Sequence, residues 1–456
     1  METAGESPGP VMAALDGAAL AEYRRRCGCA LDVALGRTPM YESWRARDPG
    51  PGRDVDARYR ALPFLTKADI RAFFPYGLVP KGRDLDAALA RGELSFVRTS
   101  GTADEALQNI WNQAWWDASE RASWSLNSVA RSVATGTHAE AILASALSVG
   151  PRSDGSGPDG PTLDREKRRL GRFLFLNEFG RTDEWPPGHE ARILAELAEE
   201  RPAVLEANPS LLARVCRWAA RHGARPWQPP LITLTYEFPS ALHLKAIRKV
   251  FSSPIASSYG STEAGYVFME CEHGRLHQNT ESCRVDLGSL DADADLEPRE
   301  GALGRLLVST LGNEWFPLLR FEIGDVGRVA GPCPCGRTGG LVLSAVEGRL
   351  KSLCVGSGGR LITHARIDSA LAAIEGLDQY RLDQDAPDEA RLSVVAAPDA
   401  RAADVACASR RVVAALLGPE LRIQASSVPE LLPEPSGKFL LVHRSFPLPI
   451  PGTTRS

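Results

Sequence analysis

The chain has 456 residues, with 53 Lys and Arg against 57 Asp and Glu, so its formal net charge is only −4. This balance argues against a nucleic-acid partner, which needs a basic surface. The sequence has no apolar run of about 18 residues and no basic, apolar leader, so we expect neither a membrane partner nor a secretory signal. Nine cysteines without an export signal predict reduced thiols in a cytoplasmic protein.

The first part of the chain carries the signals of helices around one short strand. Residues 11–30 have the apolar spacing of a helix, and Thr66 is placed to cap another. Residues 94–98 predict a strand that runs into the polar turn Thr99-Ser100-Gly101-Thr102. Residues 114–134 predict a further helix with an apolar face.

Further along, strand-like and helix-like segments alternate, which is typical of βαβ units in a parallel sheet. The strand-like segments are 173–176, 203–205, 231–235 and 255–258, and the helical ones are 191–199, 210–222 and 241–251. From about residue 276, short strands and turns predict a β-rich subdomain. We therefore expect an α/β protein in which residues 1–348 form a large N-terminal domain of parallel α/β sheets and the β-rich part. Residues 352–456 would form a small, mobile α+β domain beyond a hinge near Lys351.

Two short motifs could bind phosphate or a nucleotide, although each is also compatible with an ordinary turn. The hydroxyls and backbone N–H groups of the turn at residues 99–102 can cradle a phosphate. Residues 258–265 follow a predicted parallel strand, and α/β sheets bind ligands at the carboxyl ends of such strands. There Tyr259 can stack on a base, Thr262 can donate to a phosphate, and Glu263 can hold Mg²⁺.

Three more positions are weak signals when each is considered alone. Asp325 ends a predicted strand, and its carboxylate suits a ribose diol or caps a turn. Arg349 and Lys351 lie in a turn before the last domain, where a solvated linker is the alternative. Lys438 lies in a glycine turn near the C-terminus, where a lone lysine is usually a surface residue.

The order of these motifs is more specific than any one of them. In that order the chain resembles the adenylate-forming superfamily of acyl-CoA synthetases, and within it the phenylacetate–CoA ligase-like branch. The similar segments are the phosphate loop Ser100-Gly101-Thr102, the segment Tyr259-Gly260-Ser261-Thr262-Glu263, the ribose aspartate Asp325, the hinge residues Arg349 and Lys351, and the C-terminal Lys438. The likeness covers nearly the whole chain except about residues 140–195.

The resemblance implies that the protein activates a carboxylic acid, aryl or aryl-like, with ATP and Mg²⁺. The carboxylate would attack the α-phosphate, giving acyl-AMP and pyrophosphate, and the acyl group would pass to CoA. Two alternatives stay open: transfer to an amine or a carrier protein, and a non-catalytic member that binds a nucleotide or a partner. The sequence also leaves open whether the chain forms a homodimer.

The resemblance also implies a role for each matched residue. Lys438, Glu263 and Thr262 would be catalytic: the lysine neutralises charge at the α-phosphate, the glutamate ligates Mg²⁺, and the threonine contacts phosphate. Lys351 would be the hinge about which the small domain rotates. The implied nucleotide-binding residues are Ser100, Gly101, Thr102, Tyr259, Gly260, Asp325 and Arg349.

Two short pairs, Cys271-x-His273 and Cys333-x-Cys335, could chelate a metal. Three thiols and an imidazole can close a tetrahedral Zn²⁺ site with no open position, so we expect a structural zinc. The branch that the chain resembles often carries a cysteine cluster at this place. Four unrelated reduced side chains are the alternative.

The chain departs from the family pattern in its phosphate loop. Thr102 is followed by Ala103-Asp104-Glu105, which places two carboxylates where triphosphate oxygens would pass. Like charges at this distance raise the energy of the bound state, so we expect weak, Mg²⁺-dependent ATP binding unless the loop turns outward. In the ribose motif, Glu322 and Ile323 replace an arginine and a threonine.

Overall fold

The computed structural model describes residues 17–99, 107–152 and 162–448, which form two compact units. The first unit combines the N-terminal segment up to Ser128 with residues 258–346, and the second combines residues 129–257 with residues 347–449. The chain enters the second unit at Glu347, and this unit also contains the middle segment 129–257. The separate domain predicted beyond Lys351 stays a prediction. The fold is mixed α/β, as the sequence predicts.

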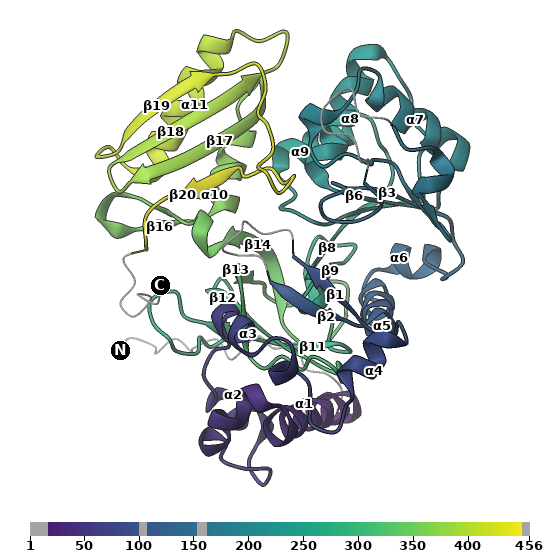
Figure 1. Cartoon of the computed structure of the whole chain (residues 1–456). Helices are drawn as coiled ribbons and strands as arrows, with labels where there is room; N and C mark the ends of the chain where they lie inside the picture. Colours follow the sequence, from purple (N-terminus) through teal and green to yellow (C-terminus); the bar gives the residue numbers. More distant parts are fainter. Residues whose placement is uncertain (1–16, 100–106, 153–161, 449–456) are drawn as a thin grey trace. The chain divides into compact units, whose positions relative to one another are not determined.

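The first unit has a mostly antiparallel sheet with helices from the N-terminal segment (Figure 1). The sheet has the strand order β11-β12-β13-β14-β10-β9-β8, and β1 and β2 form a separate hairpin. The helices are α1 (Gly17–Arg37), α2 (Val55–Arg60), α3 (Lys67–Phe73), α4 (Leu85–Ala90) and α5 (Gln113–Trp124). The strands are β1 (Ser95–Arg98), β2 (Gln108–Trp111), β9 (Gly265–Glu270), β10 (Leu276–Gln278), β11 (Cys283–Gly288), β12 (Leu303–Thr310), β13 (Phe321–Val329) and β14 (Val342–Arg349).

The second unit contains the predicted parallel sheet. Strands β5, β3, β6, β7 and β8 lie side by side and run parallel, with β4 antiparallel at the edge beside β5. The strands are β3 (Glu140–Leu143), β4 (Arg169–Leu170), β5 (Phe173–Phe175), β6 (Val204–Ala207), β7 (Leu231–Leu234) and β8 (Ile255–Ser261), whose last residues belong to the first unit. The helices are α6 (Ser128–Val133), α7 (His189–Glu200), α8 (Pro209–His222) and α9 (Ala241–Arg248).

The C-terminal part of the second unit is a small mixed sheet of order β19-β18-β17-β20, with α11 packed on β18 and β19 (Figure 1). Its elements are β15 (Cys354–Val355), β16 (Leu361–Ile362), α10 (His364–Ala372), β17 (Leu377–Ala386), β18 (Glu389–Ala396), α11 (Ala402–Leu417), β19 (Arg422–Ser427) and β20 (Val442–Arg444). Leu242 of α9 lies in the same hydrophobic core as this sheet. The core thus joins the C-terminal part to the middle segment of its unit.

Local sequence accounts for several helix boundaries. Thr66 begins α3 with a capping box: its hydroxyl accepts the N–H of Asp69, and the Asp69 carboxylate accepts the N–H of Thr66. This confirms the predicted cap. The single helix predicted over residues 114–134 is wrong, because α5 ends at Trp124 and the side chain of Asn127 instead donates to the Glu270 carbonyl at 2.9 Å.

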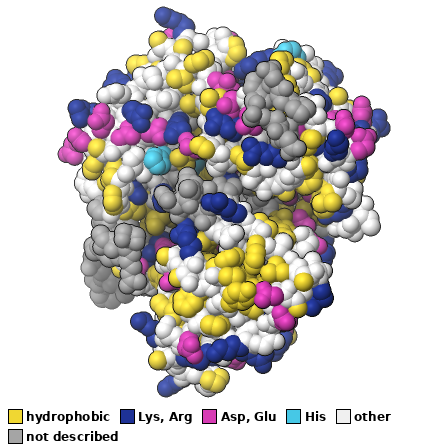
Figure 2. Space-filling view, viewed as in Figure 1, with side chains coloured by type: hydrophobic (Ala, Val, Ile, Leu, Met, Phe, Trp, Pro, Cys, Tyr) yellow, Lys and Arg dark blue, Asp and Glu magenta, His cyan; other side chains and the backbone are white. Residues whose placement is uncertain are grey.

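The surface of the described residues mixes both signs of charge. Figure 2 shows Lys and Arg interspersed with Asp and Glu over the visible face. None of the helices in the described part of the chain is long and apolar enough to cross a membrane.

Candidate active site

A tight turn between β8 and β9 presents Thr262 and Glu263. Gly265 adopts a left-handed φ of 69°, and a Cβ at Gly260 would come within 2.2 Å of the Gly265 carbonyl oxygen, so the close strand approach requires glycine at both positions. Glu263 is only 5% exposed, and no hydrogen bond or ion pair reaches its carboxylate from the residues that the structure describes. The hard oxygen atoms of a carboxylate at this position are well suited to a cation.

The structure brings Tyr259 and Asp325 together, although 66 residues separate them in sequence. The Tyr259 hydroxyl donates to Oδ2 of Asp325 at 2.8 Å. Gly324, whose φ is 94°, directly precedes this aspartate in β13. An aromatic ring and a carboxylate, both partly buried, therefore lie together in the first unit.

The unusual residues of the ribose motif have structural partners. Glu322 accepts a hydrogen bond from Nη1 of Arg305 at 2.9 Å, and Arg305 is only 4% exposed. Ile323 is buried in the hydrophobic core of the first unit. Glu322 therefore neutralises a buried arginine, which accounts for an acid at this position.

Lys438 lies in a tight turn that packs on the carboxyl edge of the parallel sheet. The N–H of Gly437 donates to the carbonyl of Glu434 at 2.8 Å, and the N–H of Glu434 donates to the carbonyl of Lys438 at 2.8 Å. Gly437 has a φ of 76°, and a Cβ there would come 2.3 Å from Oγ of Ser145 and 2.5 Å from the carbonyl oxygen of Gly180. Ser145 follows β3 and Gly180 follows β5, so the turn sits where α/β sheets bind ligands.

The other predicted site residues divide between the units or lie outside the described residues. Arg349 is the exposed last residue of β14, and Lys351 lies in the 3₁₀ turn Leu350–Ser352, so both belong with Lys438 to the second unit. Tyr259, Gly260, Thr262, Glu263 and Asp325 belong to the first unit. The residues of the phosphate loop, Ser100, Gly101, Thr102, Ala103, Asp104 and Glu105, are not among the described ones.

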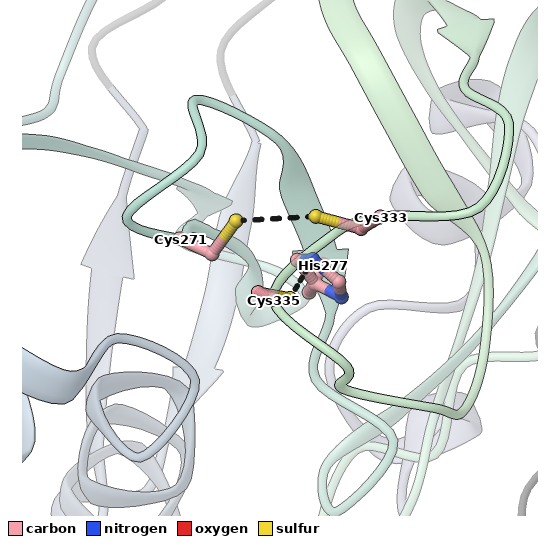
Figure 3. Close-up of side chains that lie close together, drawn as sticks. All are labelled: Cys271, His277, Cys333 and Cys335. Carbon is pink, nitrogen blue, oxygen red and sulfur yellow. Dashed lines mark hydrogen bonds between the residues drawn. The ribbon is translucent and has the colours of Figure 1, made fainter.

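Three thiols and one imidazole converge in the first unit, as Figure 3 shows. The ligand atoms of Cys271, His277, Cys333 and Cys335 all lie within 4.8 Å of one another. The Sγ atoms of Cys271 and Cys333 are 3.6 Å apart, and Sγ of Cys335 is 3.3 Å from Nε2 of His277. Tetrahedral Zn²⁺ with bonds of about 2.0–2.3 Å places its ligand atoms roughly 3.5–3.8 Å apart, so the four side chains are close enough to bind this metal after small shifts.

The imidazole of the cluster belongs to His277, and the prediction of His273 is corrected. His273 is exposed, and its N–H donates to Sγ of Cys271 at 3.4 Å. The N–H of Cys271 donates to the carbonyl of Arg275, which reverses the chain so that β10 pairs antiparallel with β9, with His277 opposite Met269. The hairpin thus brings the buried His277 beside Cys271. The metal-binding pair therefore has the spacing Cys-x₅-His rather than Cys-x-His.

An ion pair joins the two loops that carry the cluster. Both terminal nitrogens of Arg337 donate to the Glu272 carboxylate, at 2.6 and 2.8 Å, and the N–H of Arg337 donates to Sγ of Cys335 at 3.5 Å. Arg337 holds the pKa of Glu272 well below its usual range. Burial, with the Arg337 charge adding to it, lowers the pKa of His277 to about 4, so the imidazole is neutral at physiological pH, as a metal ligand must be.

Solved acid–CoA ligases share the fold of this chain. No protein-family model and no curated protein matches the sequence. The structure of a 2-hydroxyisobutyryl-CoA ligase in its postadenylation state with 2-HIB-AMP has a TM-score of 0.70 and 18% identity, over 95% of this chain and 91% of that one. An anthranilate CoA ligase, AuaEII, with anthranoyl-AMP has a TM-score of 0.51 and 12% identity, over 76% and 65%.

The similarity extends to a ligase of another type. The amide bond synthetase McbA from Marinactinospora thermotolerans has a TM-score of 0.50 and 15% identity, over 93% of each chain. At such identities the likeness establishes the fold alone. The chain has the fold of adenylate-forming, AMP-producing acid ligases.

Proposed function

We propose that the protein uses ATP to activate a carboxylic acid as acyl-AMP, releases pyrophosphate, and then transfers the acyl group to CoA. The observation that carries the proposal is the Lys438 turn, seated on the carboxyl edge of a parallel sheet in a chain with this fold. The 2-hydroxyisobutyryl-CoA ligase with that fold holds an acyl-AMP, and in another structure an acyl-AMP together with CoA. No Ser-His-Asp machinery is needed, because a mixed anhydride is already reactive.

Each predicted site residue would have a separate role in the reaction. The ammonium of Lys438 would neutralise charge that develops between the attacking carboxylate and the α-phosphate. Tyr259 and Asp325 would hold adenine and ribose, and Thr262 would donate to a phosphate. Glu263 would hold Mg²⁺, which offsets phosphate charge when bound. Arg349 and the loop Ser100-Gly101-Thr102 would complete the nucleotide site.

Transfer of the acyl group requires a second arrangement of the chain. Residues 352–456 would rotate about Lys351, which withdraws Lys438 and admits the thiol to the acyl carbon. We propose an aryl or aryl-like acid, as in the anthranilate ligase with this fold, and a short aliphatic acid, as in the 2-hydroxyisobutyryl-CoA ligase, is the alternative. The likeness to an amide bond synthetase supports transfer to an amine as the second candidate.

A panel of acids tests this proposal. Pyrophosphate release would be measured with Mg·ATP and aryl, branched aliphatic and unbranched acids, each with no acceptor, with CoA or with an amine. We expect at least one acid to drive release and CoA to accelerate turnover. Acceleration by the amine alone would favour an amide synthetase, and ATP binding without any acid-dependent release would favour a non-catalytic protein.

Substitution of Glu263 by Gln is expected to raise the Mg²⁺ concentration needed for half-maximal pyrophosphate release by about tenfold, because a metal ligand loses its charge. A buried amide of the same shape should leave the turn intact. Glu297→Gln is the matched control, since its side chain is 56% exposed in the same unit. An unaltered Mg²⁺ requirement in the Glu263 variant would remove this residue from the metal site.

We also propose that Cys271, His277, Cys333 and Cys335 bind one Zn²⁺. Four protein ligands fill a tetrahedron and leave no position for substrate, so the ion would be structural. All nine cysteines are free thiols, which suits a reducing compartment such as the cytoplasm. The ion would tie the β9–β10 hairpin to the loop after β13.

The Glu272–Arg337 pair orients both loops, so Glu272→Gln is expected to weaken zinc binding by about tenfold. The affinity would be measured by competition with a chromophoric chelator. Glu281→Gln serves as the control, because this side chain is 67% exposed and pairs with Arg26 instead. Equal zinc affinity in the Glu272 variant and the wild type would show that the ion pair does not support the site.

A further inference from the structure

The loop between β7 and α9 contacts the segment that carries Lys438. Oε1 of Glu237 accepts the N–H of Ser210 at 3.1 Å, and Oε2 accepts the N–H of Phe439 at 3.2 Å. Ser210 lies in the first turn of α8, on the middle segment of the second unit, and Phe439 directly follows Lys438. One carboxylate therefore joins the body of the sheet to the backbone beside the lysine.

Both partners of this link are backbone donors, and the Ser210 N–H is shared with Oδ1 of Asn208 at 3.0 Å. A carboxylate accepts at both ends, whereas an amide accepts at one end and donates at the other. In a Glu237→Gln variant the amide oxygen could still accept from Phe439 N–H while Ser210 N–H keeps Asn208, whereas Glu237→Ala removes the acceptor of Phe439 N–H. Burial raises the pKa of Glu237, and the hydrogen bonds from Ser210 and Phe439 oppose the rise by favouring the ionised form.

A separate link holds the C-terminal part to the same loop. The Asp368 carboxylate, from α10, accepts from the Ser240 hydroxyl, from the N–H of Ala241 at 2.7 Å and from the Tyr380 hydroxyl at 3.0 Å. Phe238 and Leu242 also pack in the core of the C-terminal sheet. Loss of Glu237 therefore leaves this part docked and releases only the backbone beside Lys438.

We propose that Glu237 is a positioning residue, which holds the Lys438 turn at the carboxyl edge of the sheet by joining Phe439 to the start of α8. The inference rests on the proposed role of Lys438 in acyl-AMP formation. The close approach of Gly437 to Ser145 and Gly180 fixes how near the turn lies to the sheet. The hydrogen bond from Phe439 to Glu237 fixes the position of Phe439, which follows the turn. The reaction rate falls steeply when the backbone that carries a catalytic lysine is displaced, because the ammonium no longer lies beside the reacting atoms.

Two measurements on the full chain test the inference. Hydrogen exchange of the peptide over residues 434–442, without substrate, is expected to quicken at least about tenfold in Glu237→Ala, the equivalent of one lost hydrogen bond. The kcat of acyl-AMP formation is expected to fall 10- to 100-fold with the KM for ATP nearly unchanged, and to fall no further in a Lys438→Ala background. Glu430→Ala, which removes an exposed pair with Arg214, is the matched control with wild-type behaviour.

The outcomes are distinct. Unaltered exchange over residues 434–442 in Glu237→Ala would overturn the inference, as would a loss of rate that adds to that of Lys438→Ala or appears mainly in the KM for ATP. If Glu237→Ala does not fold, Glu237→Asp keeps the charge but cannot span both partners, and the same exchange difference is expected. If the wild type releases no pyrophosphate with any acid, the proposed function fails, while the exchange measurement still decides the positioning.

Discussion

Lys438→Ala is expected to slow acyl-AMP formation by about 10²- to 10³-fold, the usual effect of removing one group that stabilises developing charge. The substitution removes only the side chain, so the contacts of Gly437 that seat the turn persist. Thiolysis of supplied acyl-AMP should therefore continue at nearly the wild-type rate. Pyrophosphate release measures the first half-reaction, and loss of supplied acyl-AMP in the presence of CoA measures the second.

A matched lysine separates this effect from a general loss of charge. Lys167 lies in the same unit with a side chain that is 68% exposed, so Lys167→Ala should behave as the wild type in both half-reactions. Equal pyrophosphate release in Lys438→Ala and the wild type would remove the lysine from the chemistry.

His277→Ala is expected to abolish stoichiometric zinc binding, while His273→Ala keeps about one zinc per chain. Only the first variant removes a ligand from the cluster in Figure 3, and the three remaining thiols cannot fill the fourth position of a tetrahedral site. In His277→Ala the free energy of unfolding of the first unit is expected to fall by about 2–3 kcal/mol, which would lower its Tm by roughly 5–10 °C. Metal analysis of the purified variants and calorimetry measure the two effects.

Two outcomes with these histidine variants would contradict the proposed zinc ligands. Loss of zinc from His273→Ala, with retention by His277→Ala, would restore the pairing expected from the short Cys-x-His spacing. A metal-free wild type of equal stability would show that the four side chains converge without a metal function.

The alternating strands and helices could be predicted where local preference and tertiary context agree. Strands β6 and β7 are apolar segments bounded by turns, and α8 between them buries one face and is capped by Asn208. The central strand β3 gave no strand signal, because its sequence Glu-Ala-Ile-Leu favours a helix. It is a strand because it lies fully buried between β5 and β6, where only an extended chain pairs on both sides.

The sequence predicts which residues belong to the candidate site, but not which of them contact one another. Tyr259 and Asp325 each follow from a local motif, whereas their hydrogen bond depends on how two distant strands meet. His277 was missed because the hairpin, rather than the spacing to Cys271, decides which imidazole faces the thiols. Glu237 has no motif around it that points to Phe439, 202 residues away.

The central claim is that a carboxylate oxygen attacks the α-phosphate of ATP. An acid labelled with ¹⁸O at both carboxylate oxygens, incubated with the wild-type enzyme, Mg·ATP and CoA, tests it most directly by mass spectrometry of the released AMP. The carboxylate oxygen becomes the bridging atom of acyl-AMP and leaves with AMP when the thiol attacks the acyl carbon. The account predicts one ¹⁸O atom in each AMP formed together with acyl-CoA. Unlabelled AMP, formed equally with or without the acid, would contradict it.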